Sequence, residues 1–189
     1  IVKEIRNNPP SPINFAFQKN ISYSQMSIFR GCPHRWKLQY KDKIKRFTSS
    51  IHTVFGTAVH ESMQHYLDVA YEKSFAAADR EIDIKDHFQN AYISEYQVQY
   101  KKNNNEHFSD ASEMREFFED GIAILEWFKK KRSRYFSKKG TYLVGCELPI
   151  VIAPNKMYNN VLYMGYLDVV TYHEETETFK IIDIKTSTK

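Results

Sequence analysis

The sequence predicts an α/β protein of the α+β type, with helices in its first part and strands in its last. Apolar residues recur at helical spacing in several segments of the first part, whereas β-branched residues gather in short runs of the last part. The length of 189 residues fits one domain. We expect an extended lead-in over 1–20 and a single domain over 21–189, mainly helical at 21–139 and a strand core at 140–189.

The composition indicates a folded protein with neither a membrane span nor a disulfide framework. Hydrophobic residues make up 42% of the chain and aromatic residues 15%, which excludes a disordered chain. No apolar run approaches the roughly 18 residues of a membrane span, and no signal peptide is visible. Because only Cys32 and Cys146 are present, we expect a reducing compartment, the cytoplasm.

The N-terminal segment lacks periodicity until Ser22. Residues 1–20 contain three of the six prolines, so we expect them to be extended. A short helix should begin after the hydroxyl caps near Ser22, turn Met26 and Phe29 inward, and end at Gly31. Further helices are predicted over 33–40, 55–70, 84–102 and from Asp110 or Ser112 to about 128.

The helix over 55–70 carries the first candidate ligand. Its predicted buried stripe is Val59, Met63, Tyr66, Leu67 and Ala70, and His60 lies on the flank of that stripe. Gly56 near its start would allow close approach to a sheet. A helical histidine by itself is more often packed or exposed than a metal ligand, so His60 needs partners before it indicates chemistry.

Three strands are expected after Gly140, and the last two form a hairpin. Residues 141–152 alternate as a strand with Glu147 near its middle, and β-branched runs follow near Asp168 and Asp183. If Glu174 to Glu177 form a four-residue loop, Asp168 lies directly opposite Asp183. Two adjacent carboxylates are costly unless a cation lies between them.

Asp183 and Lys185 are two residues apart, so on a strand they share one face, while Ile182 and Ile184 point the other way. Two acids and a lysine on one face suit metal-assisted phosphodiester hydrolysis. The alternative is a hairpin whose solvent face carries ordinary charges.

Two basic segments are candidate nucleic-acid contacts. The first, over 41–46, offers Lys43, Lys45 and Arg46, and could equally be a solvated connection. The second holds seven basic residues within 129–139, and we select Lys130, Lys131, Arg132 and Arg134. Cations also suit a helix C-terminus, although seven exceed what the helix dipole needs.

Four motifs in order span about residues 22–187: Ser22-Tyr-Ser24 with Cys32-Pro33, Gly56-Thr-Ala-Val-His60-Glu61, Gly165-Tyr-Leu-Asp168, and Ile182-Asp183-Ile-Lys185-Thr186. In these motifs the chain resembles the RecB-like branch of the PD-(D/E)XK nuclease superfamily, which includes CRISPR-associated and phage exonucleases. The resemblance implies a restriction-endonuclease-like mixed β-sheet flanked by helices, with a large helical region ahead of it.

The resemblance also implies roles for individual residues. It implies that His60, Asp168 and Asp183 bind Mg²⁺ or Mn²⁺ together with the Ile184 carbonyl, that Lys185 is the catalytic lysine, and that Glu147 is an auxiliary acid. Many relatives carry a Gln and a Tyr on a helix after the lysine strand, so we expect that part of the core to follow in a longer polypeptide. Some relatives hold an iron–sulfur cluster through four cysteines, which Cys32 and Cys146 cannot supply.

We therefore expect a metal-dependent nuclease that hydrolyses DNA, more an exonuclease than an endonuclease, acting on single strands or duplex ends. The resemblance implies that its setting is DNA repair, recombination, or phage or CRISPR DNA processing, in the cytoplasm of a bacterium, an archaeon or a virus-infected cell. The alternative is a catalytically silent nuclease-like module for DNA binding or assembly.

Overall fold

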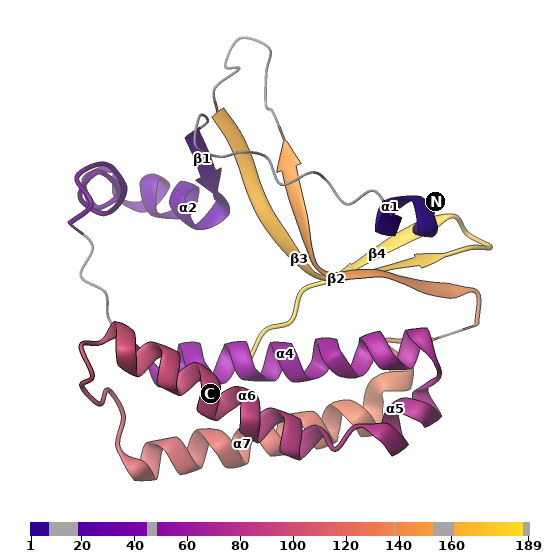
Figure 1. The fold of residues 1–189 in the computed structure, drawn as a ribbon. Helices are drawn as coiled ribbons and strands as arrows, with labels where there is room; N and C mark the ends of the chain where they lie inside the picture. The colour runs from indigo at the N-terminus through magenta and orange to yellow at the C-terminus, as the bar shows by residue number, and fades with distance from the viewer. Residues whose placement is uncertain (8–18, 45–48, 138, 153–160, 187–189) are drawn as a thin grey trace. The chain divides into compact units, whose positions relative to one another are not determined.

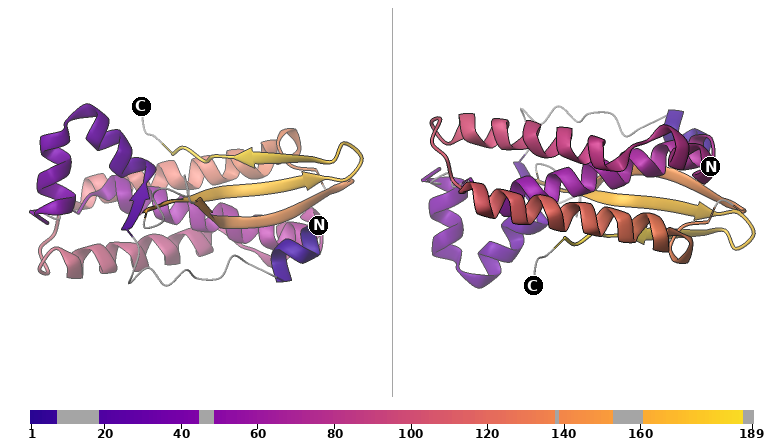
Figure 2. Two further views of the ribbon diagram at one scale, coloured as in Figure 1. Left: turned by 90° about the horizontal axis from the view of Figure 1, so that it is seen from above. Right: turned by 90° about the horizontal axis from the view of Figure 1, so that it is seen from below.

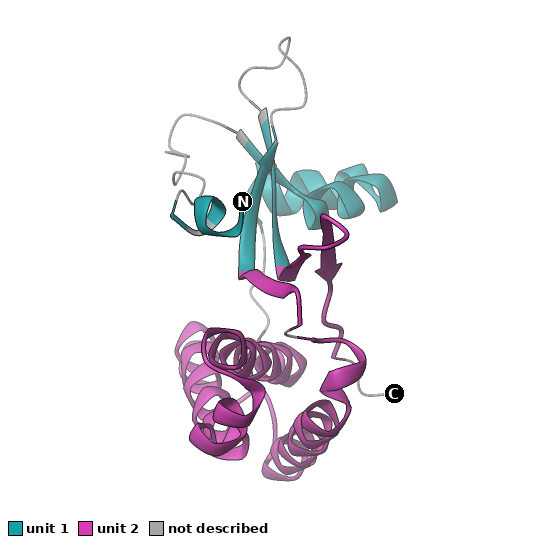
Figure 3. Ribbon diagram, turned by 90° about the vertical axis from the view of Figure 1, so that its right-hand side faces the viewer, with its two compact units in different colours: residues 1–46, 147–167 teal, residues 47–146, 168–189 magenta. Residues whose placement is uncertain are grey.

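The computed structural model describes residues 1–7, 19–44, 49–137, 139–152 and 161–186 (Figure 1). The chain divides into two compact units, drawn in different colours in Figure 3. One comprises residues 1–46 and 147–167, the other residues 47–146 and 168–189. The single domain over 21–189 stays a prediction. No helix within the described ranges is long and apolar enough to cross a membrane.

The first unit opens with short elements: α1 (Val2–Asn7), β1 (Lys19–Ser22), α2 (Tyr23–Gly31), α3 (Pro33–Trp36) and the π-helical turn η2 (Lys37–Lys41). Ser22 caps α2, because its hydroxyl accepts a hydrogen bond from the backbone N–H of Gln25. The Cys32 sulfur accepts in the same way from Arg35 at the start of α3. The capped helix predicted after Ser22, and its end at Gly31, are confirmed.

The helices of the second unit are α4 (Ile51–Glu72), α5 (Phe75–Glu81), α6 (Ile84–Lys102), α7 (Ala111–Lys131) and the short 3₁₀ turn η3 (Arg132–Arg134). Each of α4 to α7 begins at a side-chain cap that accepts backbone N–H groups: Ser50, Ser74, Asp83 and Asp110. α4 packs against α6 and α7, which also contact each other (Figure 1, Figure 2).

Close packing in this helical layer depends on Gly121 of α7. A Cβ atom at this position would stand 2.2 Å from the ring of Phe88 on α6, a distance that real Cβ atoms do not tolerate. Phe88 is fully buried and stacks on Phe118 with ring centroids 5.6 Å apart. The glycine therefore makes room for an aromatic contact between the two helices.

The strands form a mixed four-stranded sheet in the order β1-β3-β2, with β4 also paired to β3. Its members after the helices are β2 (Thr141–Ile152), β3 (Val161–His173) and β4 (Thr178–Ile182). The start of β3 pairs in parallel with β1, and its end pairs antiparallel with β4. In the second unit, Leu143, Val169 and Ile184 join the buried cluster formed by the helices, so the core lies between helices and strands.

The predicted fold class is confirmed, and several boundaries match: α6 spans 84–102, β2 spans 141–152, Asp110 caps α7, and all five residues of the predicted stripe on α4 are buried. Three expectations were wrong. Residues 2–7 are helical, with the amino group of Ile1 lying 3.3 Å from Glu4 and the N–H of Ile5 bonded to the Ile1 carbonyl. The helix α5 was overlooked, because seven residues hold too few turns to show a period.

The third wrong expectation concerns the apolar face of α2. Met26 and Phe29 are 37% and 50% exposed, and the helix has no buried residue. Both line an open apolar cavity of about 360 Å³, together with Trp36 and Tyr163. The pattern marked the apolar face correctly, but whether another element covers such a face depends on the tertiary packing.

Candidate active site

The hairpin of β3 and β4 has the predicted register. Val169 pairs with Ile182 and His173 pairs with Thr178, so the loop is the four residues 174–177. Extending this ladder by one step places Asp183 across from Asp168. However, β4 ends at Ile182, and Asp183 lies just beyond the last paired residue.

Asp168 is the most firmly held acid of the site. Its Oδ2 atom accepts a hydrogen bond of 2.6 Å from the backbone N–H of Ile184, and its carbonyl accepts one of 3.3 Å from the Gln64 amide. Only 15% of the Asp168 side chain is exposed. Two segments far apart in sequence, α4 and the residues after β4, therefore hold β3 at Asp168, in the middle of the strand.

His60 faces the same carboxylate from α4. Its Nδ1 atom lies 3.9 Å from Asp168 Oδ2, and 23% of its side chain is exposed. His60 and Asp168 are among the residues whose donor atoms gather closely enough to share one metal ion. A carboxylate oxygen with an imidazole nitrogen fits Mn²⁺ well, and Mg²⁺ through the oxygen. Gln64, one turn after His60, was not predicted, although its i+4 position relative to His60 was the available signal.

Asp183 and Lys185 form their own pair. Lys185 Nζ lies 2.7 Å from Asp183 Oδ1, with the two side chains 78% and 62% exposed. The hydrogen bond that Lys185 donates to Asp183 raises the pKa of Lys185 above its ordinary value, and the charges of Asp183 and Asp168 add to this. Among the described residues, Asp183 is outside the group that gathers with His60 and Asp168. The structure thus joins Asp168 to His60 and Asp183 to Lys185.

The predicted alternation of buried and exposed side chains continues past the end of β4. Ile184 is 8% exposed and belongs to the core, whereas Asp183 and Lys185 are exposed. Gly56 of α4 lies against this segment, since a Cβ atom there would stand 3.4 Å from the Thr186 hydroxyl. It is the Ile184 N–H that contacts Asp168 here; the Ile184 carbonyl as a metal ligand stays a prediction.

Glu147 is exposed on β2 and belongs to the other unit. Its φ of +48° lies in the left-handed region, unlike ordinary strand backbone. Such a conformation costs a non-glycine residue about 1–2 kcal/mol and often marks functional positions. Its role as auxiliary acid stays a prediction.

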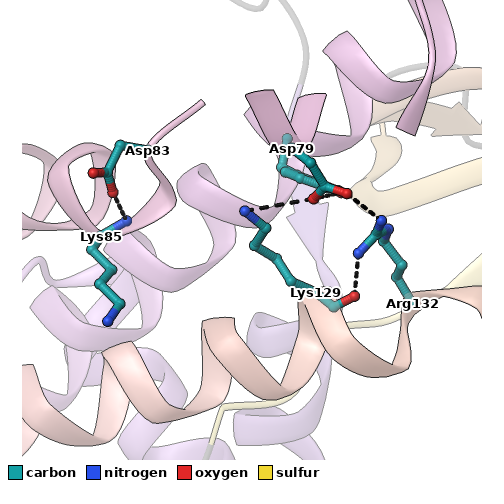
Figure 4. Close-up of polar contacts among 6 residues, drawn as sticks. Asp79, Asp83, Lys85, Lys129 and Arg132 are labelled. Carbon is teal, nitrogen blue, oxygen red and sulfur yellow. Dashed lines mark hydrogen bonds and ion pairs between the residues drawn. The ribbon is translucent and has the colours of Figure 1, made fainter. Parts of the chain in front are cut away.

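The basic residues predicted to contact nucleic acid differ in whether they form ion pairs within the protein (Figure 4). Arg132 lies 2.5 Å from Asp79 of α5 and also donates to the Lys129 carbonyl, while Lys129 lies 3.5 Å from Asp79. Across the described ranges, no ion pair involves Lys130, Lys131 or Arg134. Lys43 is exposed with φ +55°, and Lys45 and Arg46 lie outside the described residues.

A model of the PD-(D/E)XK nuclease superfamily matches residues 20–189, which is nearly the whole chain. No curated protein matches the chain significantly, and no solved structure does.

Proposed function

Because the chain belongs to the PD-(D/E)XK nuclease superfamily, we propose that it is a Mg²⁺- or Mn²⁺-dependent DNA nuclease of the RecB-like type. The observation that supports this most is the Asp168 carboxylate, oriented by the Ile184 N–H and accompanied by His60 at 3.9 Å. The catalytic lysine of this proposal, Lys185, follows Ile184 directly in the chain.

In this proposal Asp168, Asp183 and His60 hold the ion, with the Ile184 carbonyl as a further ligand and Glu147 as an auxiliary acid. A bound divalent ion supplies Lewis acidity and lowers the pKa of a coordinated water. Lys185 is protonated at neutral pH, because the ordinary pKa of lysine is 10.5 and the hydrogen bond to Asp183 raises the pKa further. Its ammonium group can orient a nucleophilic water or neutralise the negative charge that develops on the phosphate.

The RecB-like motifs favour an exonuclease that acts on a single strand or a duplex end, and DNA rather than RNA as its substrate. The proposed setting is DNA repair, recombination, or phage or CRISPR DNA processing. The basic residues Lys43, Lys130, Lys131 and Arg134 are all exposed or half-buried, and they are available to phosphates.

One observation favours a second function. Asp183 pairs with Lys185 and is outside the group of donor atoms around Asp168. A nuclease-like module that binds DNA without cutting it would tolerate this pairing, because it needs neither a second metal-binding acid nor an unpaired lysine.

The test is metal-dependent release of nucleotides from linear single-stranded and double-stranded DNA, with circular DNA as the comparison. The parent protein should degrade linear DNA in Mn²⁺ or Mg²⁺ and leave circles intact. Lys185→Ala should retain Mn²⁺ binding and slow hydrolysis by about 10²-fold or more. Glu175→Gln, an exposed acid in the hairpin loop, is the matched control and should cleave normally. DNA binding with no cleavage by the parent in any divalent ion would favour the silent module.

A further inference from the structure

Two large aromatic side chains stand exposed and adjacent at the end of α7. Trp127 is 52% exposed and Tyr135 is 46% exposed, with ring centroids 6.2 Å apart and ring planes at 48°. The neighbouring aromatic residues Phe128 and Phe136 are buried, so this segment has already supplied its core contacts. Trp127 is one of only two tryptophans in the chain, and together with Tyr135 it presents a small aromatic surface to solvent.

The cations near this aromatic pair divide into two sets. Lys129 and Arg132 are anchored: both reach Asp79 (Figure 4), and both lie 5.7 Å above the ring of Tyr66. The Tyr66 hydroxyl in turn donates to Asp79 at 2.8 Å. This set attaches the end of α7 to α4 and α5, so these two cations have a structural role.

The second set is Lys130, Lys131 and Arg134. Lys130 and Lys131 follow Trp127 by three and four residues, which places them on the same side of the helix. Arg134 is exposed and precedes Tyr135 directly. In the part of the chain that the structure describes, the ion pairs include none of these three cations. Two exposed rings therefore have unpaired positive charge beside them.

This segment is attached to the hairpin of the candidate active site. Lys180 of β4 donates a hydrogen bond of 2.9 Å to the Tyr135 carbonyl. Asp183 follows Lys180 by three residues, which corresponds to about 10 Å along an extended chain. A hydrogen bond within one unit therefore joins the segment that carries Tyr135 to the strand that leads to Asp183.

We propose that Trp127 and Tyr135 form a stacking platform for the bases of single-stranded DNA, with Lys130, Lys131 and Arg134 contacting its phosphates. Exposed rings beside unpaired cations match a strand whose bases alternate with phosphates. Duplex DNA does not fit, since its bases already stack on one another. The proposal deepens the proposed nuclease function by naming the form of its substrate, but binding at the platform needs no metal ion.

The test is the affinity for a fluorescently labelled oligomer of fifteen thymidines, measured by anisotropy in EDTA so that no cleavage occurs. Trp127→Ala should weaken binding by about tenfold or more, whereas Trp127→Phe should retain most of the affinity. Ile93→Ala removes an equally exposed apolar residue from α6 and should have no effect. Equal affinities for the parent and Trp127→Ala would overturn the proposal.

Two further readouts separate stacking from charge. In a Trp36→Phe background Trp127 is the only tryptophan, and the oligomer should quench the tryptophan emission while a blunt duplex should not. Replacing Lys130, Lys131 and Arg134 together by Ala should reduce the slope of log affinity against log salt by about 2, at roughly 0.7 per phosphate contact. An equal loss of duplex and single-strand binding in Trp127→Ala would contradict base stacking.

The platform proposal and the nuclease proposal can be refuted independently of each other. Asp168→Asn should bind the oligomer in EDTA as the parent does, even if it cleaves nothing. A parent protein that never cleaves DNA but loses oligomer affinity in Trp127→Ala would retain the platform and refute the nuclease. If the parent cleaves DNA and Trp127→Ala binds the oligomer as tightly as the parent does, the nuclease would be supported and the platform refuted.

Discussion

The backbone N–H of Ile184 donates a 2.6 Å hydrogen bond to the Asp168 carboxylate, one step past the end of the β3–β4 ladder. The contact continues the hairpin through a side chain where backbone pairing has stopped. It orients the acid and gives its Oδ2 atom a hydrogen-bond partner within the protein. The Ile184 side chain meanwhile lies in the core, so the acid is attached to a rigid part of the fold.

The first prediction separates the charge of Asp168 from its structural role. In Asp168→Asn the amide oxygen can still accept from Ile184, so the melting temperature should change by only a few degrees. Loss of the charge should weaken Mn²⁺ binding at least tenfold, because an anionic carboxylate oxygen attracts the cation more strongly than a neutral amide oxygen does. Calorimetric titration with Mn²⁺ measures this. Unchanged Mn²⁺ affinity would remove Asp168 from the metal site.

The second prediction concerns pH and His87. Burial, and then the charge of His65, lower the pKa of His87 from its ordinary value of 6.5. Their imidazole rings stack with centroids 4.5 Å apart, while the carboxylates of Glu61 and Asp86 oppose the shift. The unfolded chain binds the proton first as pH falls, so His87 should reduce stability as pH drops through about 6.5. At higher pH, His87 should have no effect on the free energy of unfolding.

Urea unfolding at pH 7.5, 6.5 and 5.5 tests this. His87→Gln should show a flatter dependence of unfolding free energy on pH than the parent. The exposed His34, replaced by Gln, is the control and should leave the dependence as it is in the parent. A parallel pH dependence in His87→Gln and the parent would show that His87 does not contribute.

The third prediction tests the packing of Gly121 against Phe88. Glycine to alanine in an exposed helix normally stabilises by about 1 kcal/mol. At Gly121 the new methyl would collide with the Phe88 ring, and overpacking of this kind costs about 1–3 kcal/mol, so Gly121→Ala should lower the unfolding free energy. Gly31→Ala, with nothing within 4 Å of its Cβ position, is the control and should not destabilise.

A double mutant makes this assignment specific. Phe88→Leu shortens the side chain that the methyl meets, so Gly121→Ala should be less harmful in that background than in the parent. Additive losses in the double mutant would mean that Gly121 matters for some other reason.

The fourth prediction uses the left-handed backbone of Glu147. Glycine adopts a φ of +48° without steric cost, so Glu147→Gly should be at least as stable as Glu147→Gln, which keeps the strained side chain. If Glu147 is an auxiliary acid, both variants should cleave DNA more slowly, and by similar factors. If Glu147→Gly is instead both the more stable and the more active of the two variants, Glu147 would have a structural role alone.

The sequence by itself determined the elements whose signals are local. The bounds of α6 match the predicted residues: the helix begins after the Asp83 cap and ends ahead of Asn104 and Asn105, whose backbone is left-handed. Such capping side chains and left-handed asparagines act within one turn. The hairpin register was also predictable, since a four-residue loop and one buried face allow only one pairing. The order of motifs from His60 to Lys185 was sufficient to indicate the superfamily whose model the chain matches.

Only the tertiary structure decided which partners these residues meet. Asp79 lies on the overlooked helix α5, and its contacts with Lys129 and Arg132 divide a basic run that looks uniform in sequence. The hairpin has the predicted register, but its ladder ends at the pair of Val169 and Ile182. Asp183 lies beyond that pair, and its side chain contacts Lys185. Periodicity reports which face of an element is apolar or charged. What covers that face depends on contacts between residues far apart in the chain, and these form only when the elements pack.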